Sequence, residues 1–118
     1  MKKPSRPEPN TSHLTFRVTL GSLPVGTLRA EGGEWFFSYS PEFRNQTEIK
    51  PIVDFPVLGK EYRGRNLWPF FALRIPSTAQ PAVREFIRTR PEEKADEGIL
   101  LKEFGARSAA NPFRLVPA

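Results

Sequence analysis

The segment Gly64-Arg65-Asn66-Leu67-Trp68-Pro69-Phe70-Phe71-Ala72-Leu73-Arg74-Ile75-Pro76 separates two halves of the chain that have different apolar patterns. Before it, apolar residues alternate with polar ones, as in strands; after it, they recur every three or four residues, as in helices. Pro69 suits the first turn of a helix, because its missing N–H would have no partner there anyway. We therefore predict a helix of about two turns that starts at Pro69 and ends before Pro76.

Three strands are predicted upstream of this segment. Leu14, Phe16, Val18 and Leu20 alternate with polar residues, and this period of two indicates a half-buried strand. Two further strands are expected over residues 24–30 and 35–39, separated from their neighbours by glycine-containing turns. The three strands would form an antiparallel meander.

The chain between this meander and Gly64 offers weaker signals. Residues 40–43 are expected to form a turn or a short helical turn. Residues 49–57 contain two prolines, which cannot donate to a ladder, so an edge strand or a loop packed on the sheet is expected. Residues 59–64 are polar and charged, which indicates a loop.

Two helices and a strand are predicted downstream. Ser77 or Thr78 can cap the first helix, which has Pro81 in its first turns and stops at Pro91. Asp96 can cap the second. The apolar stripe of the first helix would be Ala82, Val83, Phe86 and Ile87. The inward residues of the second would be Ile99, Leu100, Leu101 and Phe104, with Gly105 at its C-terminal cap.

Residues 113–116 are short and apolar, and we expect them to return to the sheet as its last strand. The predicted fold class is α+β. A small antiparallel sheet, made of the N-terminal meander and this C-terminal strand, would pack against about three short helices.

Length and composition limit the domain organisation and the cell compartment. A chain of 118 residues fits one domain, expected over residues 12–118, after a Pro-rich, polar and disordered tail at residues 1–11. There is no cysteine, no signal peptide and no apolar run long enough to span a bilayer, so a cytoplasmic protein is expected. The net charge of +5 favours acidic partners.

The sequence gives no support for an enzyme. The carboxylates are scattered, and the only histidine, His13, lies near the tail, which argues against a Ser-His-Asp arrangement. With no cysteine beside that histidine, neither a metal site nor a cofactor is expected.

Trp68 is the candidate anchor for a partner protein. Tryptophan is over-represented at binding hot spots, and Trp68 stands at an element boundary where exposure is plausible. The alternative is a core aromatic beside Phe70 and Phe71, and both interpretations fit the sequence. Polar contacts around Trp68 would come from Tyr62, Arg63, Arg65 and Asn66.

A basic face is the competing interpretation. Such a face could bind single-stranded nucleic acid through phosphate contacts and aromatic stacking. Binding to a protein is favoured, because no strand shows the aromatic alternation of an RNA-recognition sheet. The residues that could form this face are Arg63, Arg65, Arg74, Arg84, Arg88 and Arg90.

Four blocks of sequence, in order, resemble the N-terminal subdomain of HipA-family serine/threonine kinases. They are Val25-Gly26-Thr27-Leu28, the segment 36–43 (FFSYSPEF), Phe70-Phe71 with Ile75-Pro76, and the segment 100–105 (LLKEFG) followed by 113–117 (FRLVP). The family's Asp-Asn after Phe-Phe is Ala72-Leu73 here, the acidic residue after proline is Ser77, and Ala110-Asn111 replaces Gly-Ala.

The chain ends where a kinase would continue, so the resemblance implies the split form of the system. There this subdomain is a separate HipS-like antitoxin of a HipBST-type toxin–antitoxin operon. It would neutralise a HipA-like kinase by docking near the active site, alongside a helix-turn-helix DNA-binding partner. The alternative is a basic nucleic-acid-binding or transcription-regulatory accessory domain.

Overall fold

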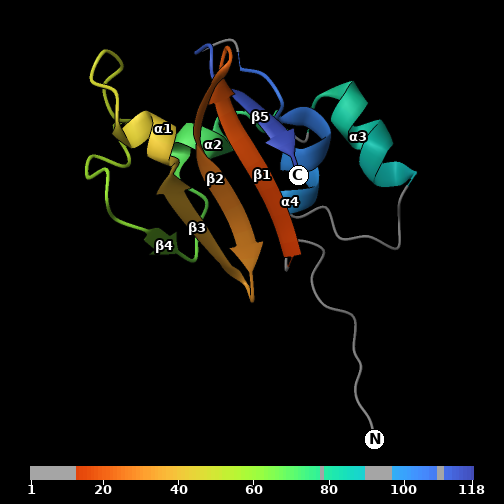
Figure 1. The fold of residues 1–118 in the computed structure, drawn as a ribbon. Coiled ribbons are helices and arrows are strands. Elements are labelled where there is room, and N and C mark those ends of the chain that lie inside the picture. The colour runs from red at the N-terminus through yellow and green to blue at the C-terminus, as the bar shows by residue number, and fades with distance from the viewer. Residues whose placement is uncertain (1–12, 78, 90–96, 109–110) are drawn as a thin grey trace, which may run out of the picture.

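The computed structural model describes residues 13–77, 79–89, 97–108 and 111–118. They form a five-stranded antiparallel sheet in the order β4-β3-β2-β1-β5 (Figure 1). The strands are β1 (His13–Leu20), β2 (Leu23–Glu31), β3 (Glu34–Tyr39), β4 (Tyr62–Gly64) and β5 (Arg114–Pro117). The helices are α1 (Pro41–Arg44), α2 (Pro69–Ala72), α3 (Pro81–Arg88) and α4 (Glu97–Phe104). The predicted α+β class, the meander and the returning C-terminal strand are confirmed.

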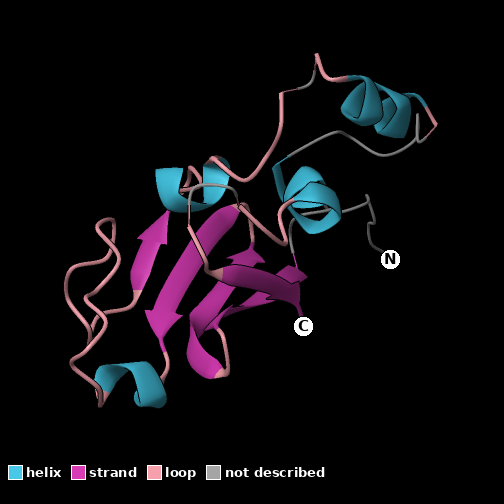
Figure 2. Ribbon diagram, turned by 90° about the horizontal axis from the view of Figure 1, so that it is seen from above, coloured by secondary structure: helices cyan, strands magenta, loops and turns pink. Residues whose placement is uncertain are grey.

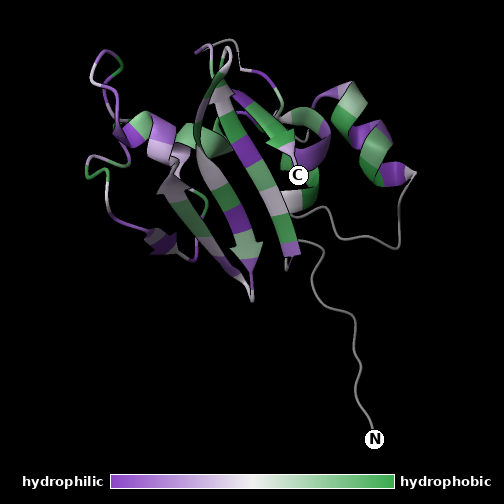
Figure 3. Cartoon of the chain, viewed as in Figure 1, coloured by the Kyte–Doolittle hydropathy of each residue, from purple (hydrophilic) through white to green (hydrophobic). Residues whose placement is uncertain are grey.

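One face of the sheet carries the core. Along β1, β2 and β3, buried residues alternate with partly or fully exposed ones, except at Val25 and Gly26, which are both buried. The hydropathy of the residues also alternates along these strands (Figure 3). This is the period of two that a half-solvated sheet requires. Large side chains from the helices and loops close the core over the buried face. The fully buried aromatics are Phe16, Phe37, Phe43, Phe55 and Phe71.

The charged segment before the central stretch is not wholly a loop. Tyr62–Gly64 form β4, which pairs with β3 at the edge of the sheet. The physical reason is the side chain of Tyr62, which packs edge-on against Phe55 with ring centroids 5.0 Å apart. On the other face Arg63 donates to Glu34 across 2.9 Å. The contacts of Tyr62 and Arg63 therefore stabilise a short edge strand within a charged segment.

Residues 45–61, between α1 and β4, form a loop, so of the two alternatives for residues 49–57 the packed loop is correct. Buried Ile52 and Phe55 attach it to the core. The hydroxyl of Tyr39 accepts a hydrogen bond from the Ile52 N–H (2.8 Å) and donates one to the Phe55 carbonyl (2.7 Å). These bonds replace the ladder that the prolines prevent.

Helix α2 starts at Pro69, as predicted, but it is one turn long rather than two. The chain then tightens: Arg74 N–H donates to the Phe71 carbonyl (3.0 Å) and Ile75 N–H to the Ala72 carbonyl (3.1 Å). These are three-residue spacings, as in a 3₁₀ turn.

The N-terminal cap of α3 was predicted wrongly. Gln80 occupies that position without a side-chain bond, and Pro81 is in the first turn as expected. Ser77 instead accepts from the N–H of Ala79 (3.0 Å). Ala82 is exposed, so it does not belong to the buried stripe of α3. Val83 is the one residue of this helix that is fully buried.

Viewed from above, α3 lies at the margin of the molecule rather than over the sheet (Figure 2). It meets α4 through Phe86 and Phe104, whose ring centroids are 5.5 Å apart. In α4, Leu100 and Leu101 are buried as predicted, and Gly105 follows directly. A Cβ at Gly105 would lie 2.6 Å from the Leu101 carbonyl oxygen, so space, not positive φ, requires glycine there.

Five sequence expectations lie outside the described residues: the disordered tail at residues 1–11, the alternative cap Thr78, Arg90 of the basic face, the stop at Pro91 and the cap Asp96. Within the part of the chain that is described, no helix combines the length and apolar character needed to cross a membrane.

Candidate partner-binding surface

The structure brings the five predicted site residues to one corner of the sheet. Tyr62 and Arg63 are on the edge strand β4, Arg65 and Asn66 are in the turn that follows, and Trp68 is the N-cap of α2. We call these five residues the β4–α2 corner. The turn is tight enough for the indole of Trp68 to fold back toward Gly64. A Cβ at Gly64 would lie 3.5 Å from Cζ2 of that ring.

Trp68 is half-buried, which falls between the two interpretations of its sequence context. Its ring meets the buried ring of Phe55 edge-on, with centroids 5.0 Å apart. The residue as a whole is only partly buried, so some of its surface stays accessible at the corner. Tryptophan in this setting has a fixed orientation and an accessible edge, so it can contact a partner without being reordered.

The loop before β4 also fixes the corner. Oδ2 of Asp54 accepts a hydrogen bond of 2.9 Å from the N–H of Phe70. Because Trp68 supplies no side-chain cap, Asp54 satisfies one of the free N–H groups at the start of α2. Sequence reasoning missed this residue, since no local motif links positions 54 and 70.

The other four corner residues differ in how free they are. The hydroxyl of Tyr62 accepts from the Val57 N–H (2.7 Å), so part of its role is structural. Arg63 is paired with Glu34 and also lies over the ring of Phe36. The side chains of Arg65 and Asn66 are exposed and make no hydrogen bond or ion pair with any other described residue. They are therefore available to a partner.

The arginines considered for a nucleic-acid interface do not form one face. Arg74 is 5% exposed and points inward. Arg84 and Arg88 are on α3, at the opposite end of the molecule from β4 (Figure 1), and Arg90 lies outside the described residues.

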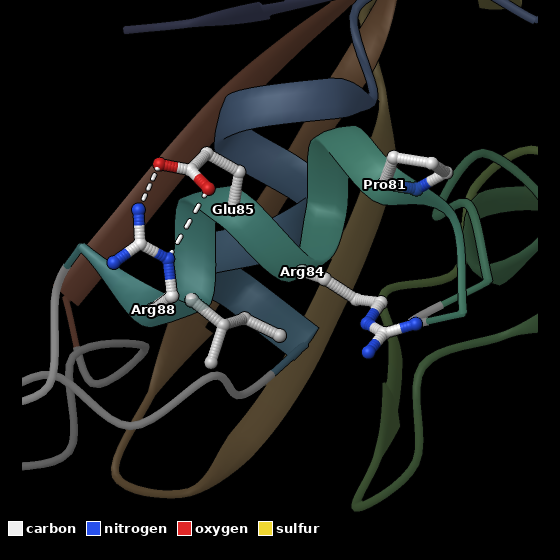
Figure 4. A pocket seen from close by; sticks show the side chains of 5 residues that line it. Pro81, Arg84, Glu85 and Arg88 are labelled. Atoms are coloured by element: carbon white, nitrogen blue, oxygen red, sulfur yellow. Dashed lines mark hydrogen bonds and ion pairs between the residues drawn. The ribbon is translucent and has the colours of Figure 1, made fainter.

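A hollow of about 540 Å³ lies beside α3 and is lined in part by Arg84 and Arg88. Figure 4 shows Arg84 pointing away from Glu85 and Arg88, which are joined by an ion pair of 2.6 Å. The charge of Arg88 is thus balanced locally, as is that of Arg29, which pairs with Glu31 and Glu61. The arginines considered for this interface therefore do not form a continuous basic groove over the described residues.

Comparison with known proteins identifies the family. The family model for the HipA N-terminal domain matches residues 16–109. The chain belongs to the HipA N-terminal domain family. A solved structure described as the N-terminal domain of HipA toxin is similar over 89% of this chain and 92% of its own, with 18% identity and a TM-score of 0.58. At that identity the likeness establishes the fold. Curated protein sequences gave no match.

Family membership relates the chain to HipA-type toxin–antitoxin systems. The domain is a non-catalytic subdomain, and this is compatible with a protein that is not an enzyme. A HipA-family domain also suggests association with a HipA-type toxin.

Proposed function

We propose that this chain is an antitoxin that binds a HipA-like serine/threonine kinase and inhibits it by docking near the active site. The β4–α2 corner is the docking element, with Trp68 as its anchor. The chain acts without catalysis of its own, in the cytoplasm, and residues 12–118 fold as the single unit that presents the corner. A helix-turn-helix DNA-binding protein belongs to the same complex.

The observation that carries this proposal is the fixed indole of Trp68, which packs on the core and is only partly buried. The ring of Phe55 and the close turn at Gly64 hold it from one side, and the Asp54–Phe70 bond fixes the helix that it begins. A rigid aromatic loses little conformational entropy when it enters a pocket, which is why such residues dominate binding hot spots.

Charge at the corner fits a kinase active site. Arg65 is exposed and has no partner among the described residues. Kinase active sites carry the acidic residues that hold magnesium and position the substrate hydroxyl. An unpaired guanidinium beside an inserted indole is complementary to that environment, and Asn66 adds neutral hydrogen-bonding capacity.

Co-expression of the kinase with Trp68→Ala tests the anchor. Truncating a hot-spot aromatic costs about 2–4 kcal/mol of binding free energy, so we expect loss of growth rescue and of complex formation. The unfolding midpoint of the variant is measured alongside, because Trp68 also packs on Phe55. Persistent rescue and complex formation by a folded Trp68→Ala chain would refute the anchor.

Arg65→Glu provides a test that leaves the core untouched, because Arg65 is exposed. We expect binding to weaken about tenfold or more, since a like charge would face the acidic residues of the kinase. Arg84→Glu is the matched control: it makes the same charge change at an exposed position on α3. Equal effects of the two variants would mean that only net charge matters.

A further inference from the structure

A groove of about 410 Å³ separates the loop at residues 49–54 from α2. Its walls are mainly apolar, and two apolar side chains on it are strongly exposed: Val53 at 91% and Leu73 at 75%. Phe70 and Phe113 also line the groove. Exposed apolar side chains gathered around a groove are typical of an interaction site.

The groove is held in shape by contacts behind it. The rings of Phe70 and Phe113 meet edge-on with centroids 5.4 Å apart. Arg74 lies over Phe70 and donates to the Phe113 carbonyl across 2.7 Å. On the loop side, the Tyr39 hydroxyl fixes the backbone at Ile52. The exposed valine and leucine are therefore presented by rigid walls, and a ligand would not need to order them.

The groove has two ionic residues of opposite charge, and only the cation makes no polar contact with the described residues. Of its two ionic residues, Asp54 accepts the Phe70 N–H and so is engaged in the fold. Lys50 is exposed and forms no ion pair with the described residues. An occupant with a carboxylate next to an apolar side chain would therefore be favoured over one with a cation there.

The groove also adjoins the β4–α2 corner. Pro69, which lines it, directly follows Trp68, and the Asp54–Phe70 bond joins the loop wall to the helix that Trp68 begins. The corner and the groove are therefore neighbours along α2, and one partner could contact both.

We propose that this groove is a second docking site for the same kinase, and that it takes a kinase segment with an apolar side chain followed by an acidic residue. The apolar side chain packs between Val53, Phe70 and Leu73, and the carboxylate meets Lys50. This inference rests on the proposed function, because it assigns the groove to the same partner.

The test is the affinity of the full chain for the kinase, measured by calorimetry, with Val53→Asp and Leu73→Asp. Both side chains are highly exposed, so these variants should fold normally. We expect each to weaken binding about tenfold, since a carboxylate would be desolvated in an apolar contact. Val57→Asp is the matched control, because Val57 is 55% exposed on the same loop but does not line the groove.

Lys50→Glu and Lys50→Arg test the chemistry of the occupant. We expect Lys50→Glu to weaken binding about threefold or more at low salt, with a smaller effect at high salt, and Lys50→Arg to bind like the natural chain. If Lys50→Glu binds as well as the natural chain, the acidic part of the proposal is wrong.

The outcomes separate the two proposals. If binding depends on Trp68 but Leu73→Asp and Val57→Asp behave alike, the groove proposal fails and the proposed function stands. If the natural chain does not bind the kinase at all, both fail. If the isolated chain self-associates in sedimentation and Leu73→Asp abolishes this, the groove is a contact between copies and the proposal is overturned.

Discussion

The hydroxyl of Tyr39 donates a hydrogen bond of 2.7 Å to the carbonyl oxygen of Phe55, 16 positions later in the chain. The hydroxyl oxygen of Tyr39 also accepts a hydrogen bond of 2.8 Å from the N–H of Ile52. One buried phenol thus holds both ends of the short loop segment that carries Val53 and Asp54. The loop supports both proposed docking surfaces, so the hydrogen bonds of the buried Tyr39 help to hold both surfaces in place.

We predict that Tyr39→Phe lowers the free energy of unfolding by about 1–3 kcal/mol, because a buried N–H and a buried carbonyl lose their partner. The ring itself is kept, including its stack on Phe43 at 4.8 Å. Urea denaturation at neutral pH measures the change. Tyr62→Phe is the control: its hydroxyl also bonds a backbone N–H, but at an exposed position, so water can replace it. Equal losses for the two variants would contradict the role given to Tyr39.

The same hydroxyl makes stability depend on pH. Burial raises the pKa of Tyr39 from 10.0 to about 12. Because the folded chain holds this proton more tightly than the unfolded chain, the contribution is complete below pH 10 and is lost as the pH rises toward 12. We expect the stability difference between the natural chain and Tyr39→Phe to shrink between pH 9 and pH 11, measured by urea denaturation at each pH. A difference that grows over that range would contradict this sign.

The strands and their apolar faces could be predicted from sequence because their signals are local. The alternation in β1 and the turns before β2 and β3 lie within a few residues of the strands that they define. Pro69 marks the start of α2 for the same reason. The edge strand β4 could not be predicted this way, since it exists through contacts of Tyr62 with Phe55 and of Arg63 with Glu34.

The candidate surface also combines features with a local sequence signal and features that depend on contacts between distant residues. The sequence singled out Trp68 by residue type and position, but its half-burial depends on Phe55, a distant residue. Asp54 and the groove around Leu73 went unnoticed because they arise where a loop meets a helix. Arg74 was expected on a basic face, but it is buried, and its guanidinium donates to the backbone carbonyls of Gly105 and Phe113.

Arg74 should be essential to the attachment of β5. Its guanidinium donates to the Gly105 carbonyl (3.3 Å), to Oδ1 of Asn111 (2.9 Å) and to the Phe113 carbonyl (2.7 Å). We predict that Arg74→Lys costs about 2–4 kcal/mol, because one ammonium cannot reach all three acceptors and would be buried incompletely paired. A larger increase in hydrogen exchange in β5 than in β2, relative to the natural chain, would show that the attachment of β5 is weakened. Arg114→Lys, at an exposed position on β5, is the control and should change neither.

Gly26 is expected to tolerate no side chain. It pairs with Tyr39 across β2 and β3, and a Cβ there would lie 2.5 Å from the Ser38 carbonyl oxygen and 2.8 Å from Cζ of Phe37. We predict that Gly26→Ala costs about 1–3 kcal/mol or more, since backbone would have to move. Thermal unfolding measures it, with Gly59→Ala as control, because a Cβ at Gly59 meets nothing within 4 Å. Equal melting temperatures of the two variants would refute the steric argument.

Asp54 connects the fold to the proposed inhibition, and its two substitutions should separate hydrogen bonding from charge. In Asp54→Ala the N–H of Phe70 loses its acceptor, so we expect a stability loss of about 1 kcal/mol, as for other lost caps. Kinase binding should weaken several-fold beyond this, because α2 and Trp68 would be held less firmly. Asp54→Asn keeps a side-chain oxygen that can accept the same bond, and we expect it to bind like the natural chain. If Asp54→Ala binds the kinase as tightly as Asp54→Asn while unfolding more easily, then the loop stabilises the fold without orienting Trp68.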